Sequence, residues 1–192
     1  MAAVNKSAAI QAVVGADDGN PIVFTTGYAS RIAKGAGQRG NHFYMVGSMG
    51  LAVSIGAGIA LTTRRTTVVV NGDGGLMMNP GGAMLAGNWP ELPLVHIVLD
   101  DGRYASTGGQ VVPAAGIEFT ALARAIGYPR VYDVDTPEAL TGLLVQVQRE
   151  PAGAVFIRCA LDEDDDPVPS RIDPDLPGHA RRFSGFLLDN GQ

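Results

Sequence analysis

The sequence predicts a three-layer α/β domain, in which helices cover both faces of a mainly parallel sheet. Two observations support this fold class. Short apolar and β-branched runs alternate with helix-like segments from residue 8 to residue 161, an order typical of parallel sheets. The runs TTVVV and LVHIVL are apolar almost throughout, as expected of strands that are buried on both faces.

The first half of the chain supplies four of the expected strands. Residues 8–16 have helical spacing, stop at Gly15 and are followed by a turn at 17–19. The β-branched run at 21–26 reads as a buried strand that ends at Gly27. The further elements expected up to residue 100 are helices at 29–37, 50–61 and 80–89 and strands at 43–47, 66–72 and 93–100.

The second half continues the alternation. A helix is expected at 118–127, with Gly127 as its C-cap. A strand at 130–134 precedes a helix at 136–148, for which Thr136 is the expected N-cap and Pro137 lies in the first turn. The last strand is expected at 153–161. Residues 1–161 therefore form the expected α/β domain, and residues 162–192 an acidic, proline-rich C-terminal arm with a terminal helix at 179–188.

Composition narrows the class of protein. Of the 192 residues, 46% are hydrophobic and only 17% are charged, which indicates a chain that either buries much of itself or covers part of its surface with a partner. The net charge of −5 argues against a non-specific nucleic-acid binder. Cys159 is the single cysteine, lies in an expected strand and suits a reducing compartment. Residues 1–14 are too weakly apolar for a signal peptide and residues 45–61 too glycine-rich for a membrane span, so we expect a cytoplasmic protein.

The number of residues between two acidic turns matches the length of one connection between parallel strands. Gly72-Asp73-Gly74 is separated by 25 residues (75–99) from Asp100-Asp101-Gly102. One helix and one strand fill that length, and they return the chain to the same edge of a parallel sheet. Asp73 and Asp101 are therefore expected to converge, and paired oxygen ligands suit Mg2+ beside a phosphate. The alternative is that both are ordinary turn residues.

This spacing resembles the thiamine-diphosphate motif, in which GDG is followed at about this distance by Asn-Asn or Asp-Asn. The resemblance implies that Asp73, Asp101 and the backbone carbonyl of Arg103 bind Mg2+, which holds the cofactor diphosphate. Because Asp101 stands where the family has Asn, an extra negative charge lies beside the diphosphate. Arg103 is the expected compensating cation.

Two further segments resemble the same family. GSMG (47–50) matches the loop in which an apolar residue, here Met49, wedges under the cofactor and the Gly47 carbonyl accepts from its aminopyrimidine. FTTGYASR (24–31) matches a loop that contacts the diphosphate. With YASTGGQ (104–110), the chain is similar over residues 20–160 to the β subunits of phosphonopyruvate and sulfopyruvate decarboxylases. The implied cofactor-binding residues are Thr26, Gly27, Tyr28, Gly47, Ser48, Met49, Gly72, Asp73, Gly74, Gly75, Asp101, Arg103 and Tyr104.

The resemblance also implies a partner. In the family, a Glu that activates the cofactor belongs to a separate pyrimidine-binding domain, and no second domain is recognisable here. We therefore expect a hetero-oligomer in which an alpha subunit supplies this Glu and the cofactor lies across the interface.

The implied activity is decarboxylation of 3-phosphonopyruvate to phosphonoacetaldehyde and CO2, only in the presence of the partner. The alternatives are sulfopyruvate decarboxylation, a carboligase or oxidoreductase half with the same cofactor, and a non-catalytic interaction protein that keeps the fold.

Other candidate motifs favour structural roles. GAGQRG (35–40) follows a helix-like segment, unlike a dinucleotide fingerprint. His96 lies inside an apolar strand and is expected in the core, whereas His42 is either structural or close to the site. The STGGQ loop (106–110) is either a plain loop or a phosphonate- or sulfonate-binding segment. The acidic run at 162–166 is expected to be a solvated surface.

Overall fold

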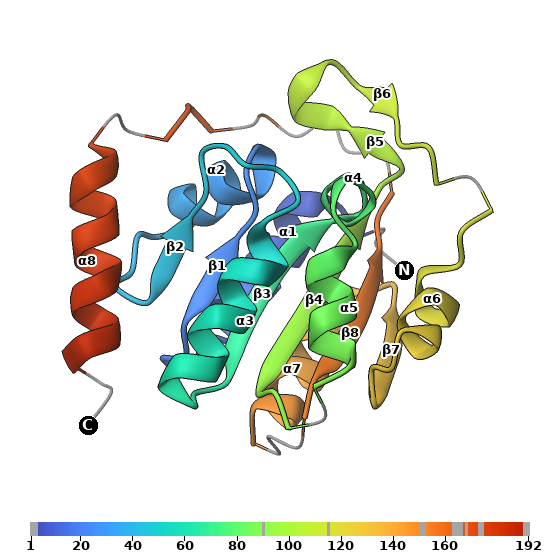
Figure 1. Cartoon of the computed structure of the whole chain (residues 1–192). Coiled ribbons are helices and arrows are strands. Elements are labelled where there is room, and N and C mark those ends of the chain that lie inside the picture. Colours follow the sequence, from blue (N-terminus) through green and yellow to red (C-terminus); the bar gives the residue numbers. More distant parts are fainter. Residues whose placement is uncertain are drawn as a thin grey trace.

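Six parallel strands form the central sheet of the computed structural model, which describes residues 4–89, 91–114, 116–149, 153–162, 167, 169–172 and 175–189. The strands lie in the order β2 (His42–Tyr44), β1 (Ile22–Phe24), β3 (Thr67–Gly72), β4 (Leu94–Asp100), β8 (Val155–Ala160) and β7 (Arg130–Val134). Every neighbouring pair is parallel. The predicted α/β class is confirmed, and Figure 1 shows the sheet between two layers of helices.

Each face of the sheet has its own hydrophobic core. One core is covered by α1 (Lys6–Gly15), α2 (Tyr28–Gly35) and α7 (Pro137–Arg149). The other is covered by α3 (Ala52–Thr63), α4 (Asp73–Met78), α5 (Gly81–Gly87) and α6 (Phe119–Ala125). Consecutive residues of β3 alternate between the cores, since Val70 packs in the first and Val69 in the second. This double burial explains the continuous apolar strands.

The small-residue character of α3 has a packing cause. At Gly56, an added Cβ would collide with the side chain of Val69 on β3. Glycine therefore lets this helix lie directly against the strand that ends at the acidic turn.

The predicted N-cap Thr136 is confirmed, whereas the C-cap of α6 is Ile126 and the predicted Gly127 lies one residue beyond it. The Thr136 hydroxyl accepts a 3.2 Å hydrogen bond from the Ala139 N–H at the start of α7. Gly127 follows α6 with φ of +100°, a conformation that favours glycine after a helix.

The helix predicted at 80–89 is present as α5. The structure adds a short helix that the sequence did not predict, α4, which begins at Asp73, immediately after the strand. Pro80 separates the two helices, because proline disfavours helical geometry in the preceding residue and Asn79 adopts φ of −151° and ψ of 85°.

The STGGQ loop contains regular structure that the sequence did not predict. Strands β5 (Arg103–Tyr104) and β6 (Gln110–Val111) pair antiparallel around the 3-10 turn η1 (Ala105–Thr107). Figure 1 shows this hairpin beyond the carboxyl ends of the main strands, beside α4.

The C-terminal arm, in the described residues before its helix, lies beyond the carboxyl ends of the main strands, as Figure 1 shows. Its helix α8 (Leu176–Asp189) begins three residues earlier than predicted and packs Phe183 on Phe43 of edge strand β2, with ring centroids 5.2 Å apart. Apart from Asp162, the acidic run at 162–166 lies outside the described residues. In the described ranges, no helix has the length and apolar character needed to cross a membrane.

The strand order contains one topological switch point. The chain passes from β1 to β2 on one side, then returns to β3 on the other side of β1. The connections at the carboxyl ends of β1 and β3 therefore diverge and leave a crevice between them. In open parallel sheets, ligands bind in this crevice.

Candidate functional site

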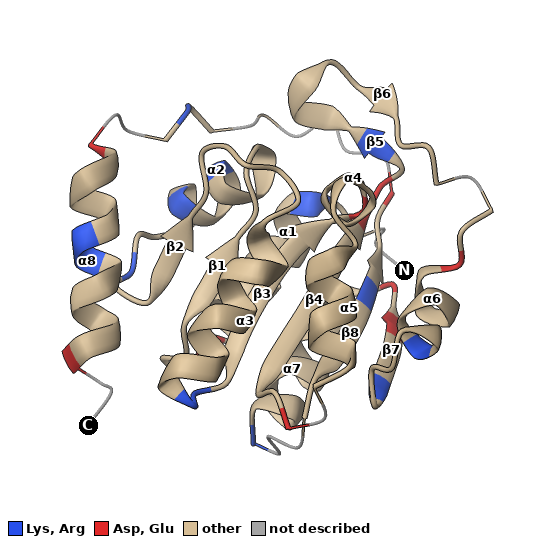
Figure 2. Ribbon diagram, viewed as in Figure 1, with Lys and Arg blue, Asp and Glu red and all other residues tan. Residues whose placement is uncertain are grey.

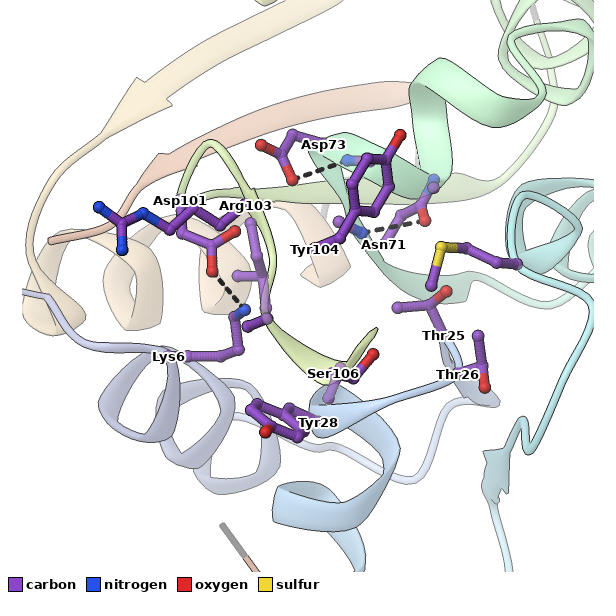
Figure 3. Close-up of a pocket in the computed structure, with 17 residues that line it drawn as sticks. Lys6, Thr25, Thr26, Tyr28, Asn71, Asp73, Asp101, Arg103, Tyr104 and Ser106 are labelled. Carbon is purple, nitrogen blue, oxygen red and sulfur yellow. Dashed lines mark hydrogen bonds and ion pairs between the residues drawn. The ribbon is translucent and has the colours of Figure 1, made fainter. Parts of the chain in front are cut away.

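A cleft of about 60 Å³ lies at this switch point, at the carboxyl ends of β1, β3 and β4. Figure 3 shows that side chains from α1, from the ends of β1 and β3 and from the β5–β6 hairpin surround this cleft. Ten of the thirteen predicted cofactor-binding residues line the cleft, namely Thr26, Tyr28, Met49, Gly72, Asp73, Gly74, Gly75, Asp101, Arg103 and Tyr104. The remaining three, Gly27, Gly47 and Ser48, line an adjoining outer pocket of about 500 Å³.

Asp73 is fixed at the bottom of the cleft. Its side chain is buried, and Oδ1 accepts a 2.7 Å hydrogen bond from the Gly74 N–H. Oδ2 accepts a 2.8 Å hydrogen bond from the Gly102 N–H, across the ends of β3 and β4. The two acidic turns therefore lie side by side, as their spacing predicts.

Burial makes the Asp73 carboxylate electrostatically costly. Desolvation raises its pKa to about 6, and the negative charges of Asp101 and Asp100 add to the increase. The backbone N–H groups of Gly74 and Gly102 act in the opposite direction without cancelling it. A cation between Asp73 and Asp101 would remove this repulsion.

The two consecutive aspartates after β4 serve different partners. Asp101 Oδ2 lies 2.6 Å from Lys6 Nζ, and both side chains are mostly buried. Asp100 instead forms a 2.6 Å ion pair with Arg158 of β8. Lys6 is therefore a cation beside Asp101 that no motif in the sequence indicates. Arg103 also lines the cleft and its side chain is exposed.

Two buried polar groups in the cleft have no hydrogen-bond partner within the described part of the chain. They are the Thr25 hydroxyl, just after β1, and the Asn71 Nδ2, near the end of β3. The Asn71 Oδ1 accepts from the Gly72 N–H at 2.9 Å, which fixes the amide with its donor unsatisfied. Buried donors without partners are costly unless a ligand accepts from them.

Glycines let the cleft wall approach closely. An added Cβ at Gly74 would collide with the Tyr104 ring, and one at Gly75 would collide with the Asn71 amide oxygen. The Tyr104 ring therefore lies directly on the GDG turn, as Figure 3 shows, and limits the size of the inner cleft.

The 47–50 loop forms the boundary between the inner cleft and the outer pocket. Met49 is partly buried and lines both cavities. The loop is bent through two positive φ angles, +56° at Ser48 and +96° at Gly50. A positive φ at a non-glycine residue is uncommon and is often associated with functional loops.

The histidines and the cysteine lie away from the cleft. His42 begins β2 at the opposite end of the sheet, where its ring nitrogens lie 3.0 Å from the Asp17 carboxylate and 3.0 Å from the Tyr44 hydroxyl. His96 is fully buried, as predicted, 3.0 Å from the Tyr128 hydroxyl, and burial lowers its pKa to about 3. Cys159 is buried as expected, and desolvation raises its pKa to about 12.

Comparison with known proteins identifies the family to which the sequence is similar. Residues 25–159 match the family described as thiamine pyrophosphate enzyme, C-terminal TPP binding domain. Thiamine pyrophosphate and thiamine diphosphate are two names for one cofactor. A phosphonopyruvate decarboxylase of Streptomyces viridochromogenes is 42% identical over 123 residues, which cover 64% of this chain and 31% of the relative.

A second relative is shorter. The sulfopyruvate decarboxylase subunit beta of Methanothermobacter thermautotrophicus is 38% identical over 62% of this chain and 65% of its own length. Among solved structures, the thiamine diphosphate-dependent 4-hydroxybenzoylformate decarboxylase of Rhodococcus jostii RHA1 matches 86% of this chain and 34% of its own, with a TM-score of 0.68 at 21% identity. That likeness concerns the fold. The match over residues 25–159 confirms the resemblance seen in the sequence: the chain belongs to the thiamine pyrophosphate enzyme family, through its C-terminal TPP-binding domain.

Proposed function

We propose that this chain is the diphosphate-binding part of a thiamine-diphosphate-dependent 2-oxo acid decarboxylase. The observation that carries the proposal is the inner cleft. Two neighbouring carboxylates, Asp73 and Asp101, line it together with two buried groups without partners, the Thr25 hydroxyl and the Asn71 amide. Carboxylates suit a hard cation, and hydroxyl and amide donors suit phosphate oxygens.

The residues present fit Mg2+ as a bridge to the diphosphate. No group of three or more His, Cys, Asp or Glu side chains in the described residues forms a metal cage. Mg2+ is commonly bound through only one or two carboxylates, together with water and phosphate oxygens. Asp73 and Asp101 would be those ligands, with the Arg103 carbonyl as a third, and Thr25 and Asn71 would donate to the diphosphate.

The 47–50 loop would orient the organic part of the cofactor. Met49 would support the bent cofactor from below, and the Gly47 carbonyl would accept from its aminopyrimidine. When bound, thiamine diphosphate supplies the electron sink for loss of CO2 from a 2-oxo acid. The protein contributes binding, orientation and the walls of the substrate pocket.

The substrate we propose is 3-phosphonopyruvate, the acid in the name of a relative that is 42% identical. The alternative, 3-sulfopyruvate, has support from a different observation. The matched stretch covers 65% of a sulfopyruvate decarboxylase subunit beta but only 31% of the phosphonopyruvate decarboxylases. Both acids carry a second anionic group beyond the carboxylate.

We further propose that an alpha subunit with a pyrimidine-binding domain completes the site and supplies the activating Glu. The names of two relatives as beta subunits support a second subunit. The face formed by α4, α5 and the segment after α5 also exposes large apolar side chains that suit a protein interface, namely Met78, Met84, Leu85 and Trp89.

Calorimetric titration tests the cofactor site first. The chain should bind thiamine diphosphate in the presence of Mg2+ and much more weakly with EDTA. Turnover of 3-phosphonopyruvate, 3-sulfopyruvate and pyruvate is then compared with and without a co-expressed pyrimidine-binding chain. Decarboxylation by the purified chain alone would contradict the proposed partner, and metal-independent binding would contradict the metal site.

A further inference from the structure

The outer pocket adjoins the inner cleft and is much larger. Its volume is about 500 Å³, within the range typical of ligand pockets, ~300–1,000 Å³. Thr26, Met49 and Ser106 line both cavities, so a molecule in the outer pocket would lie next to the proposed cofactor site.

The outer pocket is positively charged in an acidic protein. Arg31 of α2 and Arg171 of the C-terminal arm line it, and none of its described lining residues is acidic. The whole chain has a net charge of −5. In Figure 2, basic residues occur on α2 and on the arm above it, and acidic residues occur where β3 and β4 end and at the start of α8. Within the described residues, neither arginine forms an ion pair with a carboxylate.

Arg31 is held in a fixed orientation. Its Nε donates a 2.7 Å hydrogen bond to the Pro169 carbonyl, and its guanidinium carbon lies 5.2 Å from the centre of the Tyr28 ring. These contacts engage one edge and one face of the guanidinium. The two terminal nitrogens remain to donate in parallel to an oxyanion, which is the geometry that favours arginine at phosphonate- and sulfonate-like groups.

The arm is seated closely enough to form a pocket wall. Besides the Arg31–Pro169 hydrogen bond, an added Cβ at Gly35 of α2 would lie 3.1 Å from Pro169 Cγ. This contact places Pro169 on α2, two residues before Arg171. The neighbouring residue Ile172 also lines the pocket.

We propose that the outer pocket binds the second anionic group of a dianionic 2-oxo acid, with Arg31 and Arg171 as specificity-determining residues. The inference rests on the proposed function, because the inner cleft must hold the cofactor diphosphate and the 47–50 loop, which borders the outer pocket, must hold the organic part of the cofactor. The ligand chemistry is a tetrahedral oxyanion on a short carbon chain, that of a phosphonate or a sulfonate. The C-terminal arm then belongs to the substrate site, and pyruvate, which lacks the second anion, would gain nothing from it.

Arg171→Gln is the primary test, because it removes a charge without breaking a described hydrogen bond. The full chain is titrated by calorimetry with phosphonoacetate, sulfoacetate and acetate. Phosphonoacetate or sulfoacetate should bind with a Kd about tenfold weaker in Arg171→Gln, a change of ~1.4 kcal/mol. Acetate binding should not change. Arg64→Gln removes an equal charge from an exposed arginine at the end of α3 and is the matched control.

The three probes separate the possible outcomes. Preference for phosphonoacetate or for sulfoacetate would identify the anion, and Arg171→Lys should restore part of the affinity. Equal binding of phosphonoacetate and sulfoacetate by wild type and Arg171→Gln would overturn the inference. So would loss of thiamine diphosphate binding in Arg171→Gln, because the arginine would then serve the cofactor. Failure of the wild-type chain to bind thiamine diphosphate with Mg2+ would instead reject the proposed function.

In the assembled enzyme, the same variant has a kinetic readout. KM for the dianionic substrate should rise about tenfold, with the KM for pyruvate unchanged. An equal rise for both acids would indicate a structural effect of the substitution and contradict the specificity role.

Discussion

Asp73 Oδ2 accepts a 2.8 Å hydrogen bond from the backbone N–H of Gly102, so the ends of β3 and β4 are joined through one carboxylate. The second oxygen accepts from Gly74. Each carboxylate oxygen keeps a further lone pair for a cation. Backbone groups alone therefore orient the proposed metal ligand, and side-chain substitutions elsewhere in the cleft should not reorient it.

Asp73→Asn should separate metal binding from folding. Removal of the charged ligand should weaken Mg2+-dependent thiamine diphosphate binding by at least about 100-fold, ~2.7 kcal/mol. The melting temperature of the ligand-free chain should change little, because removal of a buried charge that is disfavoured, as its raised pKa indicates, offsets the one backbone hydrogen bond that the amide NH2 cannot accept. Calorimetry and thermal denaturation measure the two effects. Unchanged cofactor affinity would contradict the metal assignment.

Met49 should act through its volume. Because it lines both the inner cleft and the outer pocket, Met49→Ala should lower kcat of the assembled enzyme by removing support for the bent cofactor. Met49→Leu keeps a similar volume and should retain most activity. Met45 is a control, since it is buried in the core and does not line the inner cleft. Equal rates for the Ala and Leu variants would assign Met49 to ordinary packing.

Local signals predicted the fold well where they agreed with tertiary packing. Thr136 caps the start of α7 and Gly127 follows the end of α6, as their residue types predict. The continuous apolar strands are buried on both faces. The start of α5 at Pro80 was also predicted from the sequence, because proline is tolerated at the beginning of a helix and not in its interior. The β5–β6 hairpin was not predictable in the same way, since each of its strands has only two residues.

The residues of the candidate site that the sequence indicated belong to short continuous segments. Asp73, Met49 and Gly47 belong to such segments. Lys6 does not belong to such a segment, because it reaches the cleft only through the packing of α1. Thr25 lies within the 24–31 segment, but only its burial without a hydrogen-bond partner distinguishes its hydroxyl from its neighbours. Lys6 and Asp101 are 95 residues apart in the chain, and a contact over such a distance leaves no periodic pattern in a single sequence.

The Asp17 cluster should govern stability in acid. Burial alone raises the pKa of Asp17, but hydrogen bonds from His42, Asn41, Gly19 and Arg39 outweigh burial and hold the pKa well below its ordinary value of 3.8. Because the folded pKa is depressed, this carboxylate contributes stability that is present above about pH 4 and is lost as the pH falls below it.

Asp17→Asn tests that contribution through the free energy of unfolding in urea at pH 7 and at pH 3. The variant should be less stable than wild type at pH 7, and the difference should be smaller at pH 3. Asp18→Asn is the matched control, because Asp18 is exposed and bonds only its neighbour Asn20 among the described residues. A difference between wild type and Asp17→Asn that is constant with pH would contradict the linkage.

The last prediction concerns Lys6 and Asp101, whose Nζ and Oδ2 atoms lie 2.6 Å apart. Asp101 stands where the family motif has Asn, and the structure supplies a cation for its additional charge. Lys6 should therefore have two opposing effects. In the absence of the diphosphate, its ammonium competes with Mg2+ for the same carboxylate. With the diphosphate bound, the ammonium offsets the repulsion between Asp101 and the phosphate oxygens.

A double-mutant cycle over Lys6→Met and Asp101→Asn distinguishes these effects. Lys6→Met alone should strengthen Mg2+ binding without the cofactor and weaken thiamine diphosphate binding with Mg2+ present. Asp101→Asn alone should change Mg2+ affinity by no more than about tenfold, ~1.4 kcal/mol, because Asp73 and backbone oxygens remain. In the Asp101→Asn background, both effects of Lys6→Met should shrink, since no extra charge is left to compensate.

A parallel cycle with Arg103→Met is the comparison. Arg103 lines the same cleft but is exposed, so its coupling to Asp101 should be smaller. Additive effects of Lys6→Met and Asp101→Asn, or a larger coupling through Arg103, would show that Lys6 is not the compensating cation.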